Sequence, residues 1–332
     1  MPVTMKDVAQ KAGVSIRTVS RVVNNLGEIS EETRQQVQHV IDEIKYRPNH
    51  VARGLISGRT LSVGIIVPQI SDPFFPEFIQ GAEARGQEAG YSVLLCNTNE
   101  DPARELSHIE TLQSKQVDGI ILCGTRLSTP QLSALAEHQK MVMVTGQTPD
   151  YAAAVRIPGE EGISKVVHYL MDLGHTRIGH IGFTKQVTGE RLEGYFTALE
   201  ERGLPGNPSR TVITDQVSIE NGKAAALKLL DQAPDTTAIT CYNDMLAIGA
   251  IQACEERGLR VPGDISVTGF DDIPLASLIR PRLTTIRVDR FAAGNRAMDL
   301  LLNFITTGSP PVKRTTLDFS LVPRESTGSP AE

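Results

Sequence analysis

The stretch TMKDVAQKAGVSIRTVSRVVNN, residues 4–25, decides how the beginning of the chain folds. Thr4 and Asp7 have the spacing of a capping box, in which each side chain satisfies a backbone N–H at the start of a helix. Gly13 then permits the positive φ of a tight turn, and Ser15 can cap a second helix. Two short helices joined by a tight glycine turn are typical of a helix-turn-helix.

A third helix is expected to brace this pair. Ser30 can cap it, and Glu31 and Glu32 lie in its first turn, where carboxylates interact favourably with the helix dipole. An apolar stripe at helical spacing forms its buried face. The stripe consists of Val37, Val40, Ile41 and Ile44.

The second helix, expected over residues 16–24, carries side chains that suit DNA. Helix-turn-helix domains press this helix into the major groove, where arginine is well shaped to bind guanine O6 and N7. The alternative is a surface helix with solvated arginines. The outward-facing residues are Ile16, Arg17, Ser20 and Arg21.

The charge of the chain is divided unevenly. Residues 1–59 carry nine Lys or Arg and six Asp or Glu, a net charge of +3, while the whole chain carries −6, so the remainder carries −9. A basic head on an acidic body indicates a polyanionic partner at the head.

Length and composition bound the rest. The chain has 332 residues, enough for about two domains, and its 40% hydrophobic and 22% charged residues are ordinary for a globular protein. No apolar run approaches the roughly 18 residues of a membrane span, and the first residues do not resemble a secretory signal. The four cysteines form no C-x-x-C pair, which favours free thiols in a reducing cytoplasm.

After residue 60, apolar runs alternate with amphipathic helical stretches. This alternation predicts parallel sheets covered by helices on both faces. The runs lie at 61–68, 91–96, 119–123, 141–145, 154–157, 177–182, 238–241 and 265–270, and the helical stretches include 160–173, 189–203, 219–232 and 245–257.

Polar residues follow many of these runs. In open parallel sheets ligands bind outside the carboxyl ends of the strands, so these segments are expected to line one cleft. They include Asp72, Asn97–Asn99, Gly124–Arg126, Gly146–Thr148, Asn243-Asp244 and Asp271-Asp272. Of these, Asp272 is expected to make a local turn bond rather than a ligand bond.

Motifs along nearly the whole chain resemble the LacI/GalR (lac repressor) family. Besides residues 4–25 they are YRPNHVARGL (46–55), VDGIIL (117–122), LGHTRIGHIG (173–182), YNDMLAIGA (242–250), PGDISVTGFDD (262–272), RPRLTTI (280–286) and VPREST (322–327). The resemblance implies an all-α helix-turn-helix headpiece and an α/β body like type I periplasmic binding proteins, with two parallel-sheet subdomains.

The resemblance also implies the domain limits. Residues 1–47 would form the DNA-binding domain and 48–60 the hinge helix and linker. Residues 61–158 with 290–317 would form the N-terminal effector-binding subdomain, and 159–289 with 318–332 the C-terminal one. The chain would cross between the subdomains near 158, 289 and 317.

By this resemblance Ile16, Arg17 and Arg21 occupy the main base-reading positions. Ile16 cannot hydrogen-bond a base edge, so we expect it to contact a thymine methyl or to act by exclusion. Leu55 matches a hinge leucine that wedges into the minor groove and kinks DNA. The full expected DNA-binding set is Thr4, Ser15, Ile16, Arg17, Thr18, Ser20, Arg21, Asn24, Asn49, Ala52 and Leu55.

The resemblance places a small-molecule effector in the cleft. Carboxylates, an amide, arginines and aromatic rings suit a carbohydrate-like polyol. Two alternatives stay open: Asn243 could merely cap a helix, and Phe75 could belong to the core. Pro158-Gly159 departs from the family pattern, which puts ligand contacts from that segment in doubt. The expected effector-binding set is Asp72, Phe74, Phe75, Arg126, Arg191, Asn243 and Asp271.

The resulting expectation is a cytoplasmic transcriptional regulator, a repressor of a catabolic operon switched by a sugar or sugar derivative. It would act as a homodimer on a pseudo-palindromic double-stranded DNA operator, with an interface at the helices after Pro73 and Asn243. We expect no catalysis, metal, cofactor or membrane contact, because the sequence lacks the common nucleotide-binding, metalloprotease and hydrolase motifs. The main alternative is a sugar-binding protein without a regulatory role, which would have no use for residues 1–59.

Overall fold

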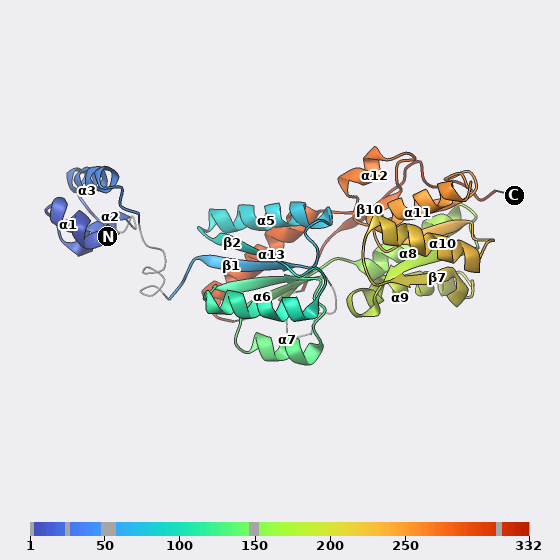
Figure 1. Ribbon diagram of the computed structural model, residues 1–332, viewed down its shortest axis with the longest axis horizontal. Helices are drawn as coiled ribbons and strands as arrows, with labels where there is room; N and C mark the ends of the chain where they lie inside the picture. The colour runs from blue at the N-terminus through green and yellow to red at the C-terminus, as the bar shows by residue number, and fades with distance from the viewer. Residues whose placement is uncertain (1–2, 24–26, 48–57, 146–152, 310–313, 332) are drawn as a thin grey trace. The chain divides into compact units, whose positions relative to one another are not determined.

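The computed structural model describes residues 3–23, 27–47, 58–145, 153–309 and 314–331, with the backbone alone over 185–189. The chain divides into two compact units, Met1–Thr60 and Leu61–Glu332 (Figure 1). Four expected DNA-binding residues lie outside the described residues: Asn24, Asn49, Ala52 and Leu55.

The first unit contains the three predicted helices, α1 Met5–Lys11, α2 Ile16–Val23 and α3 Glu31–Glu43. Thr4 and Asp7 form the expected capping box, and Ser15 Oγ accepts the N–H of Thr18 at 3.1 Å. Gly13 adopts φ 63° between α1 and α2. The core of this unit consists of Val8, Ala9, Ala12, Val19, Val22, Val37, Val40 and Tyr46.

The first half of the second unit is built on a six-stranded parallel sheet in the order β11-β5-β4-β3-β1-β2. Alternate residues of a strand face opposite sides, so Ile65 joins the cluster beneath α5 and α13 while Ile66 joins the cluster beneath α6 and α7. The strands are β1 Ser62–Val67, β2 Ser92–Asn97, β3 Gly119–Cys123, β4 Met141–Val144, β5 Ala153–Arg156 and β11 Arg314–Thr316; the helices are α5 Phe74–Glu88, α6 Pro102–Ser114, α7 Thr129–Ala136 and α13 Arg290–Thr307.

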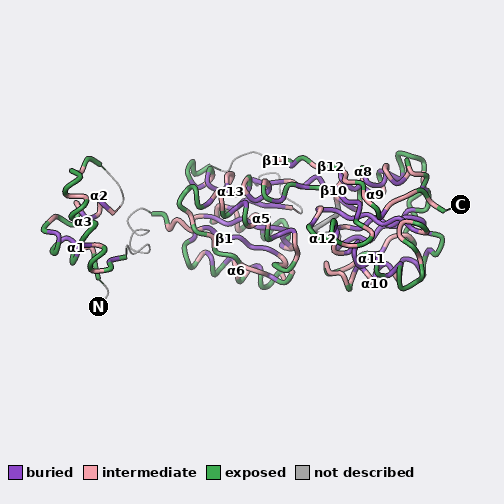
Figure 2. The backbone as a smooth tube through the Cα atoms, turned by 90° about the horizontal axis from the view of Figure 1, so that it is seen from above, coloured by how far each residue is buried: buried purple, intermediate pink, exposed green. Residues whose placement is uncertain are grey.

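The second half is built on a four-stranded parallel sheet in the order β7-β6-β8-β9. Strands β6, β8 and β9 are buried throughout, whereas the edge strand β7 is partly exposed (Figure 2). The strands are β6 Ile178–Phe183, β7 Thr211–Thr214, β8 Ala238–Cys241 and β9 Ser266–Thr268; the helices are α8 Gly159–Asp172, α9 Lys185–Glu201, α10 Ile219–Gln232, α11 Asp244–Glu256 and α12 Pro274–Leu278.

A small antiparallel sheet, β10 Thr285–Val288 with β12 Phe319–Val322, lies where the chain passes between the halves. Strand β10 leads directly into α13, and β11 leads directly into β12. The subdomain limits near 158, 289 and 317 stay a prediction, because the two compact units separate only the first 60 residues from the rest.

The predicted fold class, a helix-turn-helix headpiece followed by an α/β body of parallel sheets, is confirmed. The apolar runs that predicted strands correspond to β1–β6, β8 and β9. Of these strands, β2 is partly exposed although its run is apolar. The runs did not predict β7, β10, β11 and β12, which are three or four residues long and mostly mix apolar with polar side chains. No helix in the described ranges is both long and apolar enough to cross a membrane.

Two helix pairs approach closely through glycines. A Cβ atom at Gly294 of α13 would lie 1.8 Å from the carbonyl oxygen of Phe78 in α5, and one at Gly249 of α11 would lie 2.0 Å from that of Ile219 at the start of α10. Real atoms cannot approach this closely, so glycine is required at both contacts. The α5–α13 contact fixes the start of α5, which carries Phe74 and Phe75 into the cleft.

Candidate functional site: a cleft in the body and an exposed helix in the head

A pocket opens at the carboxyl ends of strands from both sheets of the body. All seven residues of the expected effector-binding set line it, although they come from segments far apart in the sequence. The convergence follows from the topology, because the carboxyl ends of parallel strands gather at one edge of a sheet. These residues are Asp72, Phe74, Phe75, Arg126, Arg191, Asn243 and Asp271.

Arg191, on α9, is held between two aromatic rings. Its guanidinium carbon lies 4.2 Å from the ring centroid of Tyr242 and 3.8 Å from that of Phe270. The guanidinium donates to the Tyr242 carbonyl and lies 3.5 Å from the Asp271 carboxylate. Only 7% of Arg191 is exposed, so the cation–π and hydrogen-bond contacts act with little competition from water.

Asp271 follows β9 and adopts φ 105°, a conformation that non-glycine residues rarely adopt. Its backbone N–H donates to the Ile286 carbonyl at 2.8 Å, which helps hold this geometry. Burial raises the pKa of the Asp271 carboxyl to about 7, although Arg191 opposes the rise. Strained backbone and a perturbed carboxyl in a pocket are features that functional sites share.

Asn243 and Phe75 each have a structural role and also line the pocket, so that both interpretations left open by the sequence hold: a helix cap or ligand contact for Asn243, and core or pocket for Phe75. Asn243 Oδ1 accepts the N–H of Leu246 at 3.1 Å and so caps α11, while the residue also lines the pocket. Phe75 belongs to the hydrophobic core and lines the pocket as well, with its ring edge-on to Phe74 at 5.2 Å between centroids.

Asp72 is oriented at the start of α5. Its carboxylate accepts the N–H of Phe74 at 2.9 Å. Burial raises the pKa of Asp72, and the hydrogen bond from Phe74 and the charges of Arg191 and Arg290 oppose the rise. The pocket therefore contains two carboxyl groups, Asp72 and Asp271, that burial makes costly to ionise.

Pro158-Gly159, the segment that departs from the family pattern, lies beside the Arg191 side chain. Neither residue is among the described residues that line the pocket. A Cβ atom at Gly159 would lie 2.9 Å from Cγ of Arg191, so the missing side chain leaves room for the stem of that arginine.

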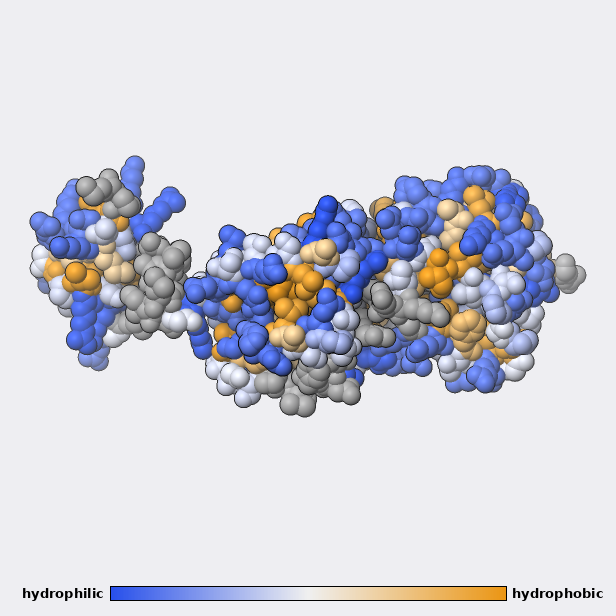
Figure 3. Space-filling model, turned by 60° about the horizontal axis from the view of Figure 1, so that its bottom comes forward, coloured by the Kyte–Doolittle hydropathy of each residue, from blue (hydrophilic) through white to orange (hydrophobic). Residues whose placement is uncertain are grey.

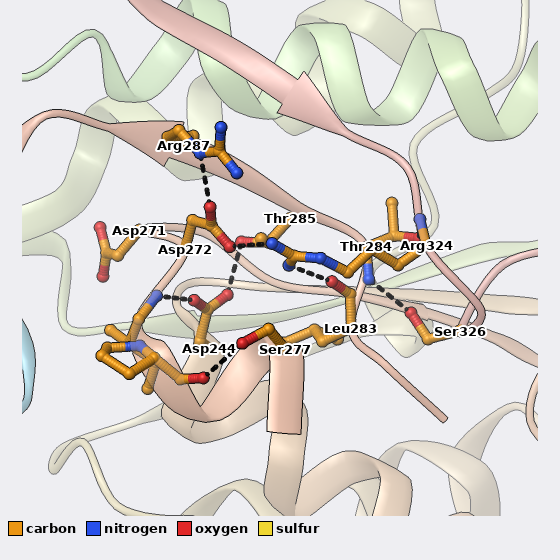
Figure 4. A network of polar contacts seen from close by, with 12 residues as sticks. Asp244, Asp271, Asp272, Ser277, Leu283, Thr284, Thr285, Arg287, Arg324 and Ser326 are labelled. Carbon is orange, nitrogen blue, oxygen red and sulfur yellow. Dashed lines mark hydrogen bonds and ion pairs between the residues drawn. The ribbon is translucent and has the colours of Figure 1, made fainter. Parts of the chain in front are cut away.

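Asp272 does not make the local turn bond that we expected. Its carboxylate accepts hydrogen bonds from Arg287 at 2.6 Å and Arg324 at 2.5 Å, two residues far along the chain. The Asp271 carboxylate points away from this network (Figure 4). The two adjacent carboxylates therefore have different roles. Asp271 faces the pocket, whereas Asp272 connects the small β10–β12 sheet to the loop after β9.

Sequence reasoning missed several pocket residues. Glu100, Phe183 and Tyr242 line the pocket beside the expected set. Phe183 ends β6 and Tyr242 immediately follows β8, so the rule that ligands bind at strand ends could have found both. Glu100 follows β2 by three residues, the same separation as that of Asp271 from β9, so the rule could have found it as well. Within the described part of the chain, no group of three or more His, Cys, Asp or Glu could hold a metal ion.

The expected DNA-binding residues of the head lie on or beside α2. Ile16 is 50% exposed, and Arg17 and Arg21 are also exposed, while Thr18 and Ser20 are half-buried. Thr4 and Ser15 are exposed and serve as helix caps. Ile16, Arg17 and Arg21 are therefore accessible to a partner.

Two family models match the chain. Bacterial regulatory proteins of the lacI family match residues 4–49, and a periplasmic binding protein-like domain matches residues 167–327.

Full-length relatives and solved structures give the same result. The HTH-type transcriptional regulator DegA of Bacillus subtilis (strain 168) is 42% identical over 294 residues, which are 86% of each chain. The lac repressor dimer bound to operator and the anti-inducer ONPF matches with a TM-score of 0.88 and 28% identity over 99% of this chain and 100% of that one. The complex of the transcriptional regulator CelR with cellobiose matches with a TM-score of 0.76 and 28% identity over 98% and 99%.

Proposed function

The chain belongs to the LacI family of bacterial regulatory proteins and is a DNA-binding transcriptional regulator, not an enzyme; we propose that a small carbohydrate-like effector binds in the cleft and switches its binding to DNA. The observation that carries this proposal is the convergence of seven effector-type side chains on one pocket. A sugar-binding protein without a regulatory role would not need the helix-turn-helix head.

The chemistry of the pocket suits a polyol. The carboxylates of Asp72 and Asp271 can accept hydrogen bonds from hydroxyl groups and the amide nitrogen of Asn243 can donate to them, while Phe74 and Phe75 offer apolar faces to a ring. The similarity to a regulator in complex with cellobiose supports the same class of ligand. A sugar or sugar derivative is therefore the effector that we propose.

In the head, we propose that α2 enters the major groove of a pseudo-palindromic operator. Arg17 and Arg21 would bind base edges, and Ile16 would contact a thymine methyl or exclude other bases. Thr4, Ser15, Thr18 and Ser20 would contact the backbone nearby. Operator binding by the similar lac repressor dimer supports this proposal and the role of a repressor, and we infer that the controlled genes form a catabolic operon.

A palindromic operator requires two copies of the chain. The apolar side chains that the body exposes suit such a homodimer: Leu94 and Leu95 on the edge strand β2, and Leu275 and Leu278 on α12, of which Leu278 is 69% exposed. Apolar patches are visible on one face of the body (Figure 3). We therefore propose β2 and α12 for the interface beside α5. Helix α11, which the family resemblance implies for the interface, exposes the polar residues Gln252, Glu255 and Glu256, and its part in the interface stays a prediction.

Thermal unfolding in the presence of four ligand classes tests the proposed effector site. We expect a sugar or sugar derivative to raise the Tm by several degrees, because a ligand at 100 times its Kd adds about 2.7 kcal/mol to the free energy of unfolding. Sugar acids, sugar phosphates and purines complete the panel.

The Asp271→Asn variant is the control for the site. A true pocket ligand should lose most of its stabilising effect on this variant, whereas an additive that acts on bulk solvent stabilises both proteins equally. If no member of the panel raises the Tm of the wild type, a carbohydrate-like effector is wrong, and operator binding by the head stands on its own.

A further inference from the structure

Arg126 stands at one edge of the cleft and contacts both halves of the body. It follows β3 in the first half, where its guanidinium lies 2.5 Å from the Glu100 carboxylate. In the second half it donates to the backbone carbonyl of Asp215 at 3.1 Å, and its guanidinium carbon lies 5.2 Å from the ring centroid of Phe183. We propose that Arg126, oriented by Glu100 of the same half, forms a latch across the cleft through its contacts with Asp215 and Phe183, and that it is a positioning residue that holds the halves together.

The base of this latch is fixed to the first half by a buried carboxylate. Glu105, on α6, is only 3% exposed and accepts the backbone N–H of Arg126 at 3.1 Å. The hydroxyl of Thr125 also donates to Glu105. The same hydroxyl accepts the N–H of Leu127 at 3.1 Å. The loop after β3 is therefore anchored, so that a contact made by the Arg126 side chain is transmitted to the whole first half.

The far end of the latch belongs to two strands of the other sheet. Phe183 is the last residue of β6, and Asp215 directly follows β7. Both strands lie side by side in the second sheet. The contacts of Arg126 thus join the carboxyl ends of strands from the two sheets, where the two halves face one another.

Water screens the attraction between Glu100 and Arg126 less than it screens the ion pairs on the surface, so that Glu100 orients the Arg126 side chain toward the second half. The side chains of Arg126 and Glu100 are 18% and 14% exposed, whereas those of Arg104 and Asp101 in the same half are 57% and 46% exposed. Water screens an exposed pair, which contributes little, but screens a buried pair much less. Burial also raises the pKa of Glu100 and Arg126 opposes the rise, so loss of Arg126 alone would leave a costly buried carboxylate.

The latch gives Arg126 a task in addition to the effector contact that we expected from the sequence. Its guanidinium is engaged by a carboxylate, a carbonyl and an aromatic ring of the protein. Arg191 and Asp271 are left as the charged pair deep in the pocket. The inference rests on the proposed function, since a latch has a purpose only if the cleft opens to admit an effector.

Distances between spin labels on the two halves test the latch in the full chain without any ligand. Exposed Glu110 on α6 and exposed Glu220 on α10 can be replaced by cysteine to carry the labels, in a chain with Cys96→Ser because Cys96 is the partly exposed thiol. We expect the double variant Arg126→Met with Glu100→Gln to raise the ratio of open to closed populations about tenfold, since it removes one charged hydrogen bond and one cation–π contact across the cleft.

The matched control is Arg104→Met, which removes an exposed arginine of the same half. It should leave the distance distribution unchanged. A distribution for the double variant that equals that of the wild type overturns the latch. Because no ligand is used, this result differs from a failure of effector binding, which the thermal panel alone detects.

Phe183→Leu keeps the test decisive if the double variant does not fold. It leaves both charges in place and removes the ring that faces Arg126 from the second half, together with the contact of that ring with Tyr242. We expect the ratio of open to closed populations to rise about two- to fivefold, in proportion to a single cation–π contact. An unchanged ratio in the folded Phe183→Leu protein would likewise overturn the latch.

Discussion

The helix α2 and the cleft both carry arginines, but they prepare them for binding in opposite ways. Arg17 and Arg21 are exposed on α2. In contrast, Arg191 is 7% exposed and lies between two aromatic rings beside Asp271. The first arrangement leaves long side chains exposed to solvent, and the second fixes one guanidinium before any ligand arrives.

This difference follows from the kind of partner that each surface suits. A polyanion attracts exposed cations from a distance, and salt weakens that attraction because counterions are released on binding. A small ligand offers few contacts, so a site gains affinity when its polar groups are already oriented. The two surfaces should therefore fail independently when residues in one of them are changed.

The largest expected effect is the loss of the effector response in Asp271→Ala. This variant removes the carboxylate that faces the pocket beside Arg191. We expect operator binding without effector to stay at the wild-type level, because the change lies in the second compact unit and not in the head. Operator binding, measured by fluorescence anisotropy with and without the ligand that raises the Tm, checks both parts.

Asp231→Ala is the matched control, since Asp231 is an exposed carboxylate on α10 that pairs with Arg257. Its response to the effector should be normal. An Asp271→Ala protein that still responds fully would show that the pocket is not the switch.

The sequence predicted the buried strands best. The expected runs at 119–123 and 238–241 agree with β3 and β8 to the residue, because a strand covered on both faces is apolar throughout. The edge strands β7 and β11 lack this signal. Strand β7 reads TVIT and exposes Ile213, and β11 reads RTT, so both depend on their neighbours for order.

For the cleft, the sequence predicted which side chains gather but not how they are held. Arg191 packs between Tyr242 and Phe270, which come from the ends of two different strands. No spacing in the sequence predicts that the Arg191 guanidinium packs between these two rings. The same is true of the partners of Asp272, because Arg287 and Arg324 reach it only once β10 and β12 have paired.

A smaller effect is expected in the pH dependence of stability. Burial raises the pKa of Asp271 to about 7 in the folded protein, where Arg191 and Arg290 oppose the rise and Asp72 adds to it, compared with 3.8 in an ordinary aspartate. Between these pH values the folded chain holds a proton that the unfolded chain releases. Its contribution to the free energy of unfolding therefore falls as pH rises, by on the order of 4 kcal/mol over the whole interval.

The Asp271→Asn variant lacks this titration, so its stability should fall less than that of the wild type as the pH rises toward 7. Urea unfolding of both proteins at a series of pH values measures the difference. Asp231→Asn, which changes an exposed carboxylate, should follow the wild type. Parallel curves for Asp271→Asn and the wild type would contradict the burial of a titrating carboxyl in the cleft.

The smallest expected effect concerns the choice of bases by the head. We expect Arg17→Ala to weaken binding to the preferred operator by about 1–3 kcal/mol and to relax the preference at one base pair, because a bidentate contact to guanine is lost. Binding to a set of operators with single base changes, at fixed salt, measures the preference. Effector binding in the cleft should not change.

Lys11→Ala provides the comparison, because it removes a cation from the head without touching α2. Lys11 pairs with Glu43 at 2.7 Å on the surface, so its loss should alter affinity equally for all operators, if at all. An Arg17→Ala protein whose affinities fall equally for every operator would behave like Lys11→Ala. Arg17 would then bind phosphate rather than a base, and the exposed face of α2 would attract DNA without reading it at that position.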